Sequence, residues 1–174
     1  MKLVNVIVTG PPSSGKSAFL ETVSEHVFHA PEQIAVGKSG QAYTIEFGRT
    51  EIKADFFLYL AGLPGDESFQ FVWERLADGL LGFVVVFDAK SRAHMDETKA
   101  LIKRLKNLTD TPFVVAFNRL DDRQAPEVSG LKKELGIPRE EQVVCCNVRE
   151  KNSAAQVLVA LLNIGVKQLK KVSA

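Results

Sequence analysis

The sequence predicts a three-layer α/β fold in which helices cover both faces of a mostly parallel sheet. Short apolar runs of strand length alternate with longer amphipathic stretches along the chain. The runs at 83–87 and 113–117 are apolar throughout, as expected of strands that are buried on both faces. No linker, internal repeat or low-complexity tract interrupts the pattern. We therefore predict six strands and five helices in one domain that spans residues 1–174.

The individual elements follow from the spacing of the apolar residues. Short runs rich in Val, Ile and Phe predict strands, whereas apolar positions three and four residues apart predict helices. In chain order the prediction is a strand at 3–8, a helix at 17–28, a loop at 29–41, strands at 42–47 and 52–61 with a turn at 48–49, a loop at 62–66, a helix at 67–79, a strand at 83–87, a helix at 95–108, a strand at 113–117, a helix at 129–135, a strand at 142–146 and a helix at 152–170.

Composition argues against several functions. The formal net charge is +1, so no strong field attracts nucleic acid or an anionic lipid surface. The apolar stretch 80–87 is too short to span a membrane, and we find no signal peptide or lipidation motif. The adjacent Cys145 and Cys146 suit packing in a reducing compartment better than a disulfide framework. We expect a cytoplasmic protein without a membrane anchor.

Residues 10–17 have the pattern of a phosphate-binding loop. They read Gly-Pro-Pro-Ser-Ser-Gly-Lys-Ser, with a predicted strand before them and a predicted helix after them. In such a loop, backbone N–H groups and the helix N-terminus bind phosphate, Lys16 reaches the β- and γ-phosphates, and the Ser17 hydroxyl ligates Mg²⁺. Pro11 and Pro12 have no N–H to donate. The alternative is a chance match in a Gly/Ser turn. The predicted nucleotide-binding residues are Gly10, Ser13, Ser14, Gly15, Lys16, Ser17 and Ala18.

A second motif follows the predicted strand at 113–117. Residues 118–121 read Asn-Arg-Leu-Asp, and a carboxylate such as Asp121 can accept two hydrogen bonds from guanine, a donor pair that adenine lacks. With the phosphate loop, this tetrapeptide resembles the Asn-Lys-x-Asp motif of Ras-like small GTPases. The resemblance implies that Asn118 braces the loop and contacts the base, and that Arg119 stacks on the purine in place of Lys. The alternative is an ordinary Asn/Asp turn.

The resemblance to Ras-like small GTPases covers nearly the whole chain. It implies that 42–47 is an antiparallel strand paired with 52–61, and that the nucleotide lies at the carboxyl ends of the strands. It also implies that the loop after the last strand, Asn147-Val148-Arg149, gives a backbone N–H to the guanine O6. That loop differs in residue type from the family's Ser-Ala-Lys, and the alternative is a plain strand-to-helix connection.

The segment after the third predicted strand resembles the family's γ-phosphate-sensing loop, known as switch II, but departs from it twice. Pro64, Gly65 and Phe69 match a bacterial and archaeal Thr-Pro-Gly-Gln-Glu-Arg-Phe pattern, to which the Mgl-type gliding-motility GTPases are related. Gly65 would sense the γ-phosphate through its N–H. Gly62 stands where the family has an Asp that holds a Mg²⁺-bound water, and Asp66 stands where it has the Gln that orients the attacking water. Because a carboxylate is repelled by phosphate and cannot donate as an amide does, we expect slow hydrolysis.

The other mobile loop of the family, switch I, is harder to align. Its Thr, which closes over Mg²⁺ and the γ-phosphate, falls at Gln41 and Ala42 when Glu46-Phe47-Gly48 is matched to the branch's Asp-Phe-Gly. Ser39 and Thr44 are nearby candidates. We therefore assign no residue to this role.

Three further residues have open roles. Gln70 replaces the water-orienting Gln only if its loop shifts. Asp88, at the end of a predicted strand, either binds metal or opens the following loop or caps a helix, and we favour the interpretation without metal. Phe71 either contacts a protein partner or packs against a neighbouring helix.

Together these motifs predict a GTP-binding switch that uses Mg²⁺ and hydrolyses GTP slowly or with help from a partner. Lys16, Gly65 and Asp66 are the candidate catalytic residues, and the γ-phosphate would order the loops at 37–44 and 62–70 for a protein effector or regulator to read. Resemblance to the Mgl-type GTPases implies a Roadblock-type regulator. Two alternatives stay open: a nucleotide-binding module that hydrolyses nothing, and a P-loop kinase or ATPase, which would leave residues 118–121 unexplained.

Overall fold

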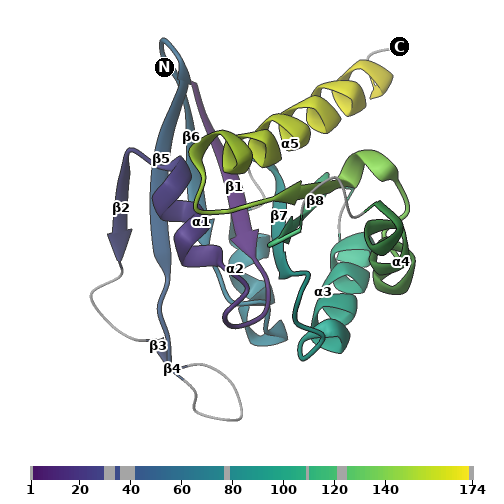
Figure 1. Ribbon diagram of the computed structural model, residues 1–174. Helices are drawn as coiled ribbons and strands as arrows, with labels where there is room; N and C mark the ends of the chain where they lie inside the picture. The colour runs from purple at the N-terminus through teal and green to yellow at the C-terminus, as the bar shows by residue number, and fades with distance from the viewer. Residues whose placement is uncertain are drawn as a thin grey trace.

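A seven-stranded, mostly parallel sheet forms the centre of the structure, a computed structural model that describes residues 2–29, 34–35, 42–76, 79–108, 110–120 and 125–172. The parallel neighbours are, in order, β6 (Phe56–Gly62), β1 (Lys2–Thr9), β7 (Leu80–Asp88), β8 (Phe113–Asn118) and β9 (Val143–Cys146). Antiparallel β5 (Glu46–Lys53) pairs with β6, and antiparallel β2 (His26–His29) pairs with β5 (Figure 1). A separate small sheet pairs β3 (Ile34–Ala35) with β4 (Ala42–Tyr43).

Helices cover both faces of the sheet, which confirms the predicted three-layer α/β fold. The first face carries α1 (Lys16–Val23) and α5 (Lys151–Val172), and the second carries α2 (Gln70–Arg75), α3 (Met95–Leu108) and α4 (Ala125–Leu135) (Figure 1). Two short 3₁₀ turns, η1 (Glu67–Phe69) and η3 (Glu140–Gln142), precede α2 and β9. The five α-helices of the described residues agree in number with the prediction.

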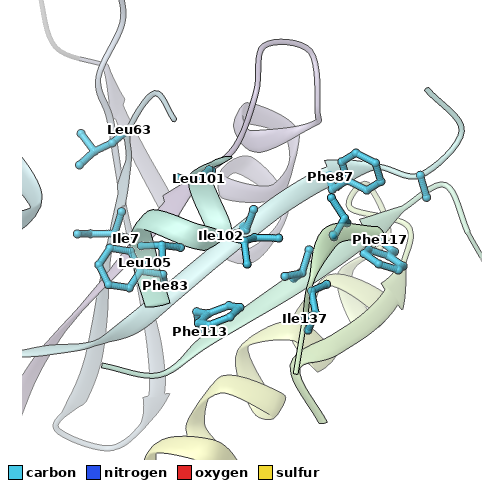
Figure 2. Packing of buried hydrophobic residues seen from close by; sticks show 14 of the residues in the cluster. Ile7, Leu63, Phe83, Phe87, Leu101, Ile102, Leu105, Phe113, Phe117 and Ile137 are labelled. Atoms are coloured by element: carbon cyan, nitrogen blue, oxygen red, sulfur yellow. The ribbon is translucent and has the colours of Figure 1, made fainter. Parts of the chain in front are cut away.

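Phenylalanines of β7 and β8 form the centre of the core on the second face. Phe87 and Phe117 meet edge to face, with ring centroids 5.8 Å apart. Side chains of α3, among them Ile102 and Leu105, lie over these strands (Figure 2). Burial on both faces explains why the strand sequences are continuously apolar. The packing on both faces also holds the carboxyl ends of β1, β7 and β8 next to one another. The candidate site begins at these ends.

The sheet has seven strands rather than the predicted six, because residues 26–29 form β2 and not the end of a helix. The first helix ends at Val23, and Ser24 is extended, with φ −97° and ψ 145°. The backbone N–H of Glu25 then donates to the carbonyl of Arg49, 2.9 Å away, and begins the pairing with β5. Val27, assigned to the apolar stripe of a helix, is the one half-buried residue of β2. Pairing with a distant strand therefore overrides the local periodicity.

The hairpin of β5 and β6 also differs from the prediction. Its turn lies at residues 54–55, where Asp55 has φ 64°, and not at 48–49. Gly48 is a strand residue opposite Leu60, and it is required there because a Cβ would collide with Ser24. The predicted helix at 67–79 is also shorter, with a 3₁₀ turn first and an end at Arg75. The predicted loop at 29–41 contains the short strand β3.

Candidate functional site

The loop between β1 and α1 turns tightly at two glycines. Gly10 has φ 145°, and a Cβ on it would collide with the carbonyl oxygen of Val86 in β7. Gly15 has φ 109° and precedes the first residue of α1. Ser13 also has a positive φ, 58°. The predicted phosphate loop therefore has the expected strand–loop–helix setting, with the N-terminus of α1 facing the loop.

Lys16 reaches back over this loop. Its Nζ donates to the carbonyl oxygens of Gly10 at 2.9 Å and Pro11 at 2.8 Å. Burial lowers the pKa of Lys16 to about 8, and the charges of Glu46 and Glu97 oppose that shift. An anionic phosphate beside the ammonium would favour its charged form, as the predicted role requires.

A buried amide connects three loops at the other end of the site. Asn118, 4% exposed, donates from Nδ2 to the carbonyl of Ser14 at 3.1 Å, and its Oδ1 accepts from the backbone N–H of Val148 at 3.3 Å. A Cβ on Gly15 would lie 2.7 Å from Asn118 Nδ2. The phosphate loop, the end of β8 and the loop after β9 are thus held as one unit. The bracing predicted for Asn118 matches this geometry.

The loop after β9 uses its own backbone donors. The N–H of Asn147 donates to Ser153 Oγ at 2.9 Å, and the N–H of Arg149 donates to Asn147 Oδ1 at 3.1 Å. The N–H of Val148 is the one bound to Asn118. All three predicted donors therefore have acceptors inside the protein, and a bound base would have to share or replace one of them.

Arg119 and Asp88 form an ion pair beside this unit. Arg119, in a left-handed conformation with φ 67°, places Nη1 2.9 Å from Asp88 Oδ2. Asp88 Oδ1 accepts from the N–H of Lys90 at 3.1 Å, which agrees with the favoured interpretation that it opens the following loop. Asp121 lies outside the described residues.

The loop after β6 lies across the opening of the phosphate loop. A Cβ on Gly65 would come within 3.2 Å of the Gly10 carbonyl oxygen, and the Gly65 carbonyl accepts a hydrogen bond from Arg104 of α3. Asp66 caps η1 by accepting from the Ser68 N–H at 2.8 Å and from the Ser68 hydroxyl. These bonds, with the Ser68 hydroxyl first, lower the pKa of Asp66. Asp66 is therefore an ionised cap of η1, and it lines the same cleft as Lys16.

Three residues with open roles fall on this side of the site. Gln70 donates to Glu74 along α2 at 3.1 Å. Thr44 lines the cleft and is exposed. Phe71 is 52% exposed, whereas Phe69 and Trp73 are buried in the core. Of the other switch I candidates, Ser39 and Gln41 lie outside the described residues, and of Ala42 only the backbone, in β4, is described.

A carboxylate that the sequence reasoning missed faces Ser17. Glu46, the first residue of β5, accepts from the Ser17 hydroxyl at Oε2, 2.7 Å away, and its Oε1 lies 3.3 Å from His29 Nδ1. Glu46 is paired in register with Gly62, the last residue of β6. The pairing register of β5 and β6 would have indicated Glu46 from the sequence, but the hairpin turn was predicted at the wrong residues.

An open cleft of about 1280 Å³ lies between the phosphate loop, the start of β5, the loop after β6 and α3. Its lining includes Gly10, Lys16, Ser17, Glu46, Gly65 and Arg104. Within the described residues no cluster of three His, Cys, Asp or Glu side chains is arranged to hold a metal ion. Mg²⁺ binds proteins through one or two side-chain oxygens together with phosphate and water oxygens, and the Ser17 hydroxyl in this cleft is an oxygen ligand of that kind.

Comparison with known proteins identifies the family. The sequence model of the Ras family matches residues 5–167. This chain belongs to the Ras family. The Ras-related protein RABA1b of Arabidopsis thaliana is 24% identical over 139 residues, which are 80% of this chain and 59% of that protein. The chain thus spans little more than half the length of this curated relative. The predicted resemblance to Ras-like small GTPases is confirmed, whereas the Mgl-type branch stays a prediction.

Two solved structures share the fold. The small COPII coat GTPase SAR1 from Encephalitozoon cuniculi, in complex with GDP, superposes with a TM-score of 0.70 at 16% identity, over 98% of this chain and 83% of that one. The cytosolic domain of the T. maritima FeoB iron transporter, in apo form, gives a TM-score of 0.62 at 16% identity, over 94% of this chain and 64% of that one. Among the described helices, none has the length and apolarity of a membrane span.

Proposed function

We propose that this chain binds GTP and GDP in the cleft and acts as a Ras-like switch with slow or partner-dependent hydrolysis. The observation that carries the proposal is the Asn118 bridge, because it joins the phosphate loop to the two loops from which a guanine would be recognised. Family membership supports the same nucleotide. In the proposed complex, Lys16 and the loop N–H groups bind the phosphates, and Asp121 selects the base.

A bound Mg²⁺ would neutralise phosphate charge, with Ser17 as one ligand. The chain's own residues then limit the chemistry. Asp66 is ionised and accepts a hydrogen bond from Ser68, so its side chain has no donor for an attacking water. The side-chain amide of Gln70 donates to Glu74 instead. Slow intrinsic hydrolysis follows. A protein partner, of the Roadblock type if the Mgl-type resemblance holds, would rearrange this segment or supply an Arg. The proposed setting is cytoplasmic, with residues 1–174 acting as one domain.

Nucleotide competition tests the binding proposal. Fluorescent GDP is titrated onto the purified chain, and unlabelled GTP, GDP and ATP compete for the site. Displacement by GTP and GDP but not by ATP supports the proposal, and loss of binding in Lys16→Ala assigns the site to the phosphate loop. If ATP displaces as well as GTP, the guanine assignment fails and a P-loop kinase or ATPase becomes the better hypothesis.

A second candidate is a nucleotide-binding module that does not hydrolyse GTP, and the capping role of Asp66 favours it. Single-turnover hydrolysis of bound GTP with Mg²⁺ separates the two candidates. Measurable phosphate release from the bound GTP supports the slow GTPase. Bound GTP that stays intact, with and without candidate partners, supports the module.

A further inference from the structure

The cation-binding side of the cleft lacks a side chain at position 62. Gly62 ends β6 beside Val8 and packs directly under α1, where a Cβ would collide with Leu20 Cδ1. No larger residue fits there without moving a fully buried leucine. A carboxylate for the site must therefore come from another position of the cleft lining.

Glu46 places a carboxylate next to the Ser17 hydroxyl from the neighbouring strand. It is directly opposite Gly62 in the β5–β6 register, and its side chain is 13% exposed. Its Oε2 lies 2.7 Å from Ser17 Oγ, while Oε1 lies towards His29. Among the ion pairs of the described residues, Glu46 has no Lys or Arg partner at close range, although its charge acts on Lys16.

The two oxygens fit a hard divalent cation. Adjacent oxygen ligands of an octahedral Mg²⁺, each at about 2.1 Å, lie about 3.0 Å apart, close to the observed separation of Ser17 Oγ and Glu46 Oε2. Mg²⁺ binds through one or two protein oxygens together with phosphates and waters. A single half-buried carboxylate beside a hydroxyl therefore meets the requirement, without a larger acidic cluster.

We propose that Glu46 of β5 supplies the carboxylate of the divalent-cation site, next to Ser17, in place of a side chain at position 62. The carboxylate contacts the ion or one of its water molecules. The inference rests on the proposed nucleotide function, because the phosphates complete the ion's ligands. The proposed acidic residue thus lies on the antiparallel strand β5 rather than on β6, the strand before the switch II loop.

The test measures how strongly Mg²⁺ retains fluorescent GDP on the full chain. Dissociation is followed after adding excess unlabelled GDP, in Mg²⁺ and in EDTA, for the wild type, Glu46→Gln and the control Glu51→Gln. Glu51 is an exposed carboxylate on the same strand. We expect Mg²⁺ to slow release at least about tenfold in the wild type and the control, and to have little effect in Glu46→Gln. Binding of Mn²⁺ to the GDP-loaded proteins, measured by EPR, should be lost in parallel.

The outcomes separate the two proposals. GDP that fails to bind the wild type even in EDTA overturns the proposed function itself. GDP that binds but is retained by Mg²⁺ equally in the wild type and Glu46→Gln overturns the role of Glu46, as does a wild type without any Mg²⁺ effect. If Glu46→Gln does not fold, Glu46→Ala carries the same expectation and the same contradicting result.

Discussion

The two ends of the candidate site are built in different ways. At one end, the buried Asn118 joins the phosphate loop to the ends of β8 and β9 through two hydrogen bonds. At the other end, Gly62 leaves no room for a side chain, Asp66 caps a turn, and Glu46 reaches Ser17 from an antiparallel strand. The first end consists of short sequence motifs that these hydrogen bonds bring together. The second depends on strand register and packing.

Removing the buried amide should give the largest effect. Asn118→Ala leaves the Ser14 carbonyl and the Val148 N–H without their partner, so we expect the free energy of unfolding to fall by about 2–4 kcal/mol. GDP affinity should fall at least tenfold, because the loops are no longer aligned. Urea denaturation and fluorescent GDP titration measure both. The control is Asn107→Ala, an exposed position on α3, which should change neither.

A side chain at position 62 should disturb packing rather than improve the cation site. Gly62→Asp is expected to lower the free energy of unfolding by about 1–3 kcal/mol, because its Cβ collides with Leu20. Gly130→Asp is the matched control, since a Cβ at Gly130 of α4 meets nothing within 4 Å. Stronger Mg²⁺ retention of GDP in Gly62→Asp, at undiminished stability, would contradict this comparison.

Nucleotide binding should take up protons near pH 8. The pKa of Lys16 is about 8, so part of the population is neutral at that pH, and bound phosphate favours the charged form. We expect uptake of about half a proton at pH 8 and almost none at pH 6.5. Calorimetry in buffers of different ionisation enthalpy measures it. Lys16→Arg stays charged throughout and should abolish the uptake; an unchanged uptake in that variant would assign the proton to another group.

The smallest effect concerns thiol reactivity at the end of β9. Cys146 is the last residue of β9, directly before the loop that Asn118 holds, and burial raises its pKa to about 12. We expect iodoacetamide at pH 8 to leave Cys146 unmodified in the native wild type and to modify it faster in Asn118→Ala, because that variant opens more often. Peptide mass spectrometry distinguishes it from Cys145. Equal protection of Cys146 in the wild type and in Asn118→Ala would show that the hydrogen bonds of Asn118 do not keep the end of β9 closed to the reagent.

The fold and the phosphate loop were predictable because local patterns determine them. The alternation of apolar runs with amphipathic stretches gave the three layers, and the glycine spacing at 10–15 matched the positive φ angles found there. Strand β2 and the position of the hairpin turn were not predictable. Both depend on strand pairing, because β2 pairs with the distant strand β5, and the β5–β6 register sets the position of the turn. Glu46 was missed for the same reason, because only the register places it opposite Gly62.

The most direct test of guanine-nucleotide binding is base selectivity in Asp121→Asn, measured by competition of GTP and xanthosine triphosphate against a fluorescent guanine or xanthine nucleotide. Replacing the carboxylate by an amide exchanges an acceptor for a donor and should match the xanthine carbonyl. We expect the wild type to bind GTP more tightly than xanthosine triphosphate, and the variant to bind xanthosine triphosphate more tightly than GTP. The ratio of the two affinities should change by at least about tenfold between the two proteins. A variant that binds GTP as tightly as the wild type would contradict the proposed base recognition.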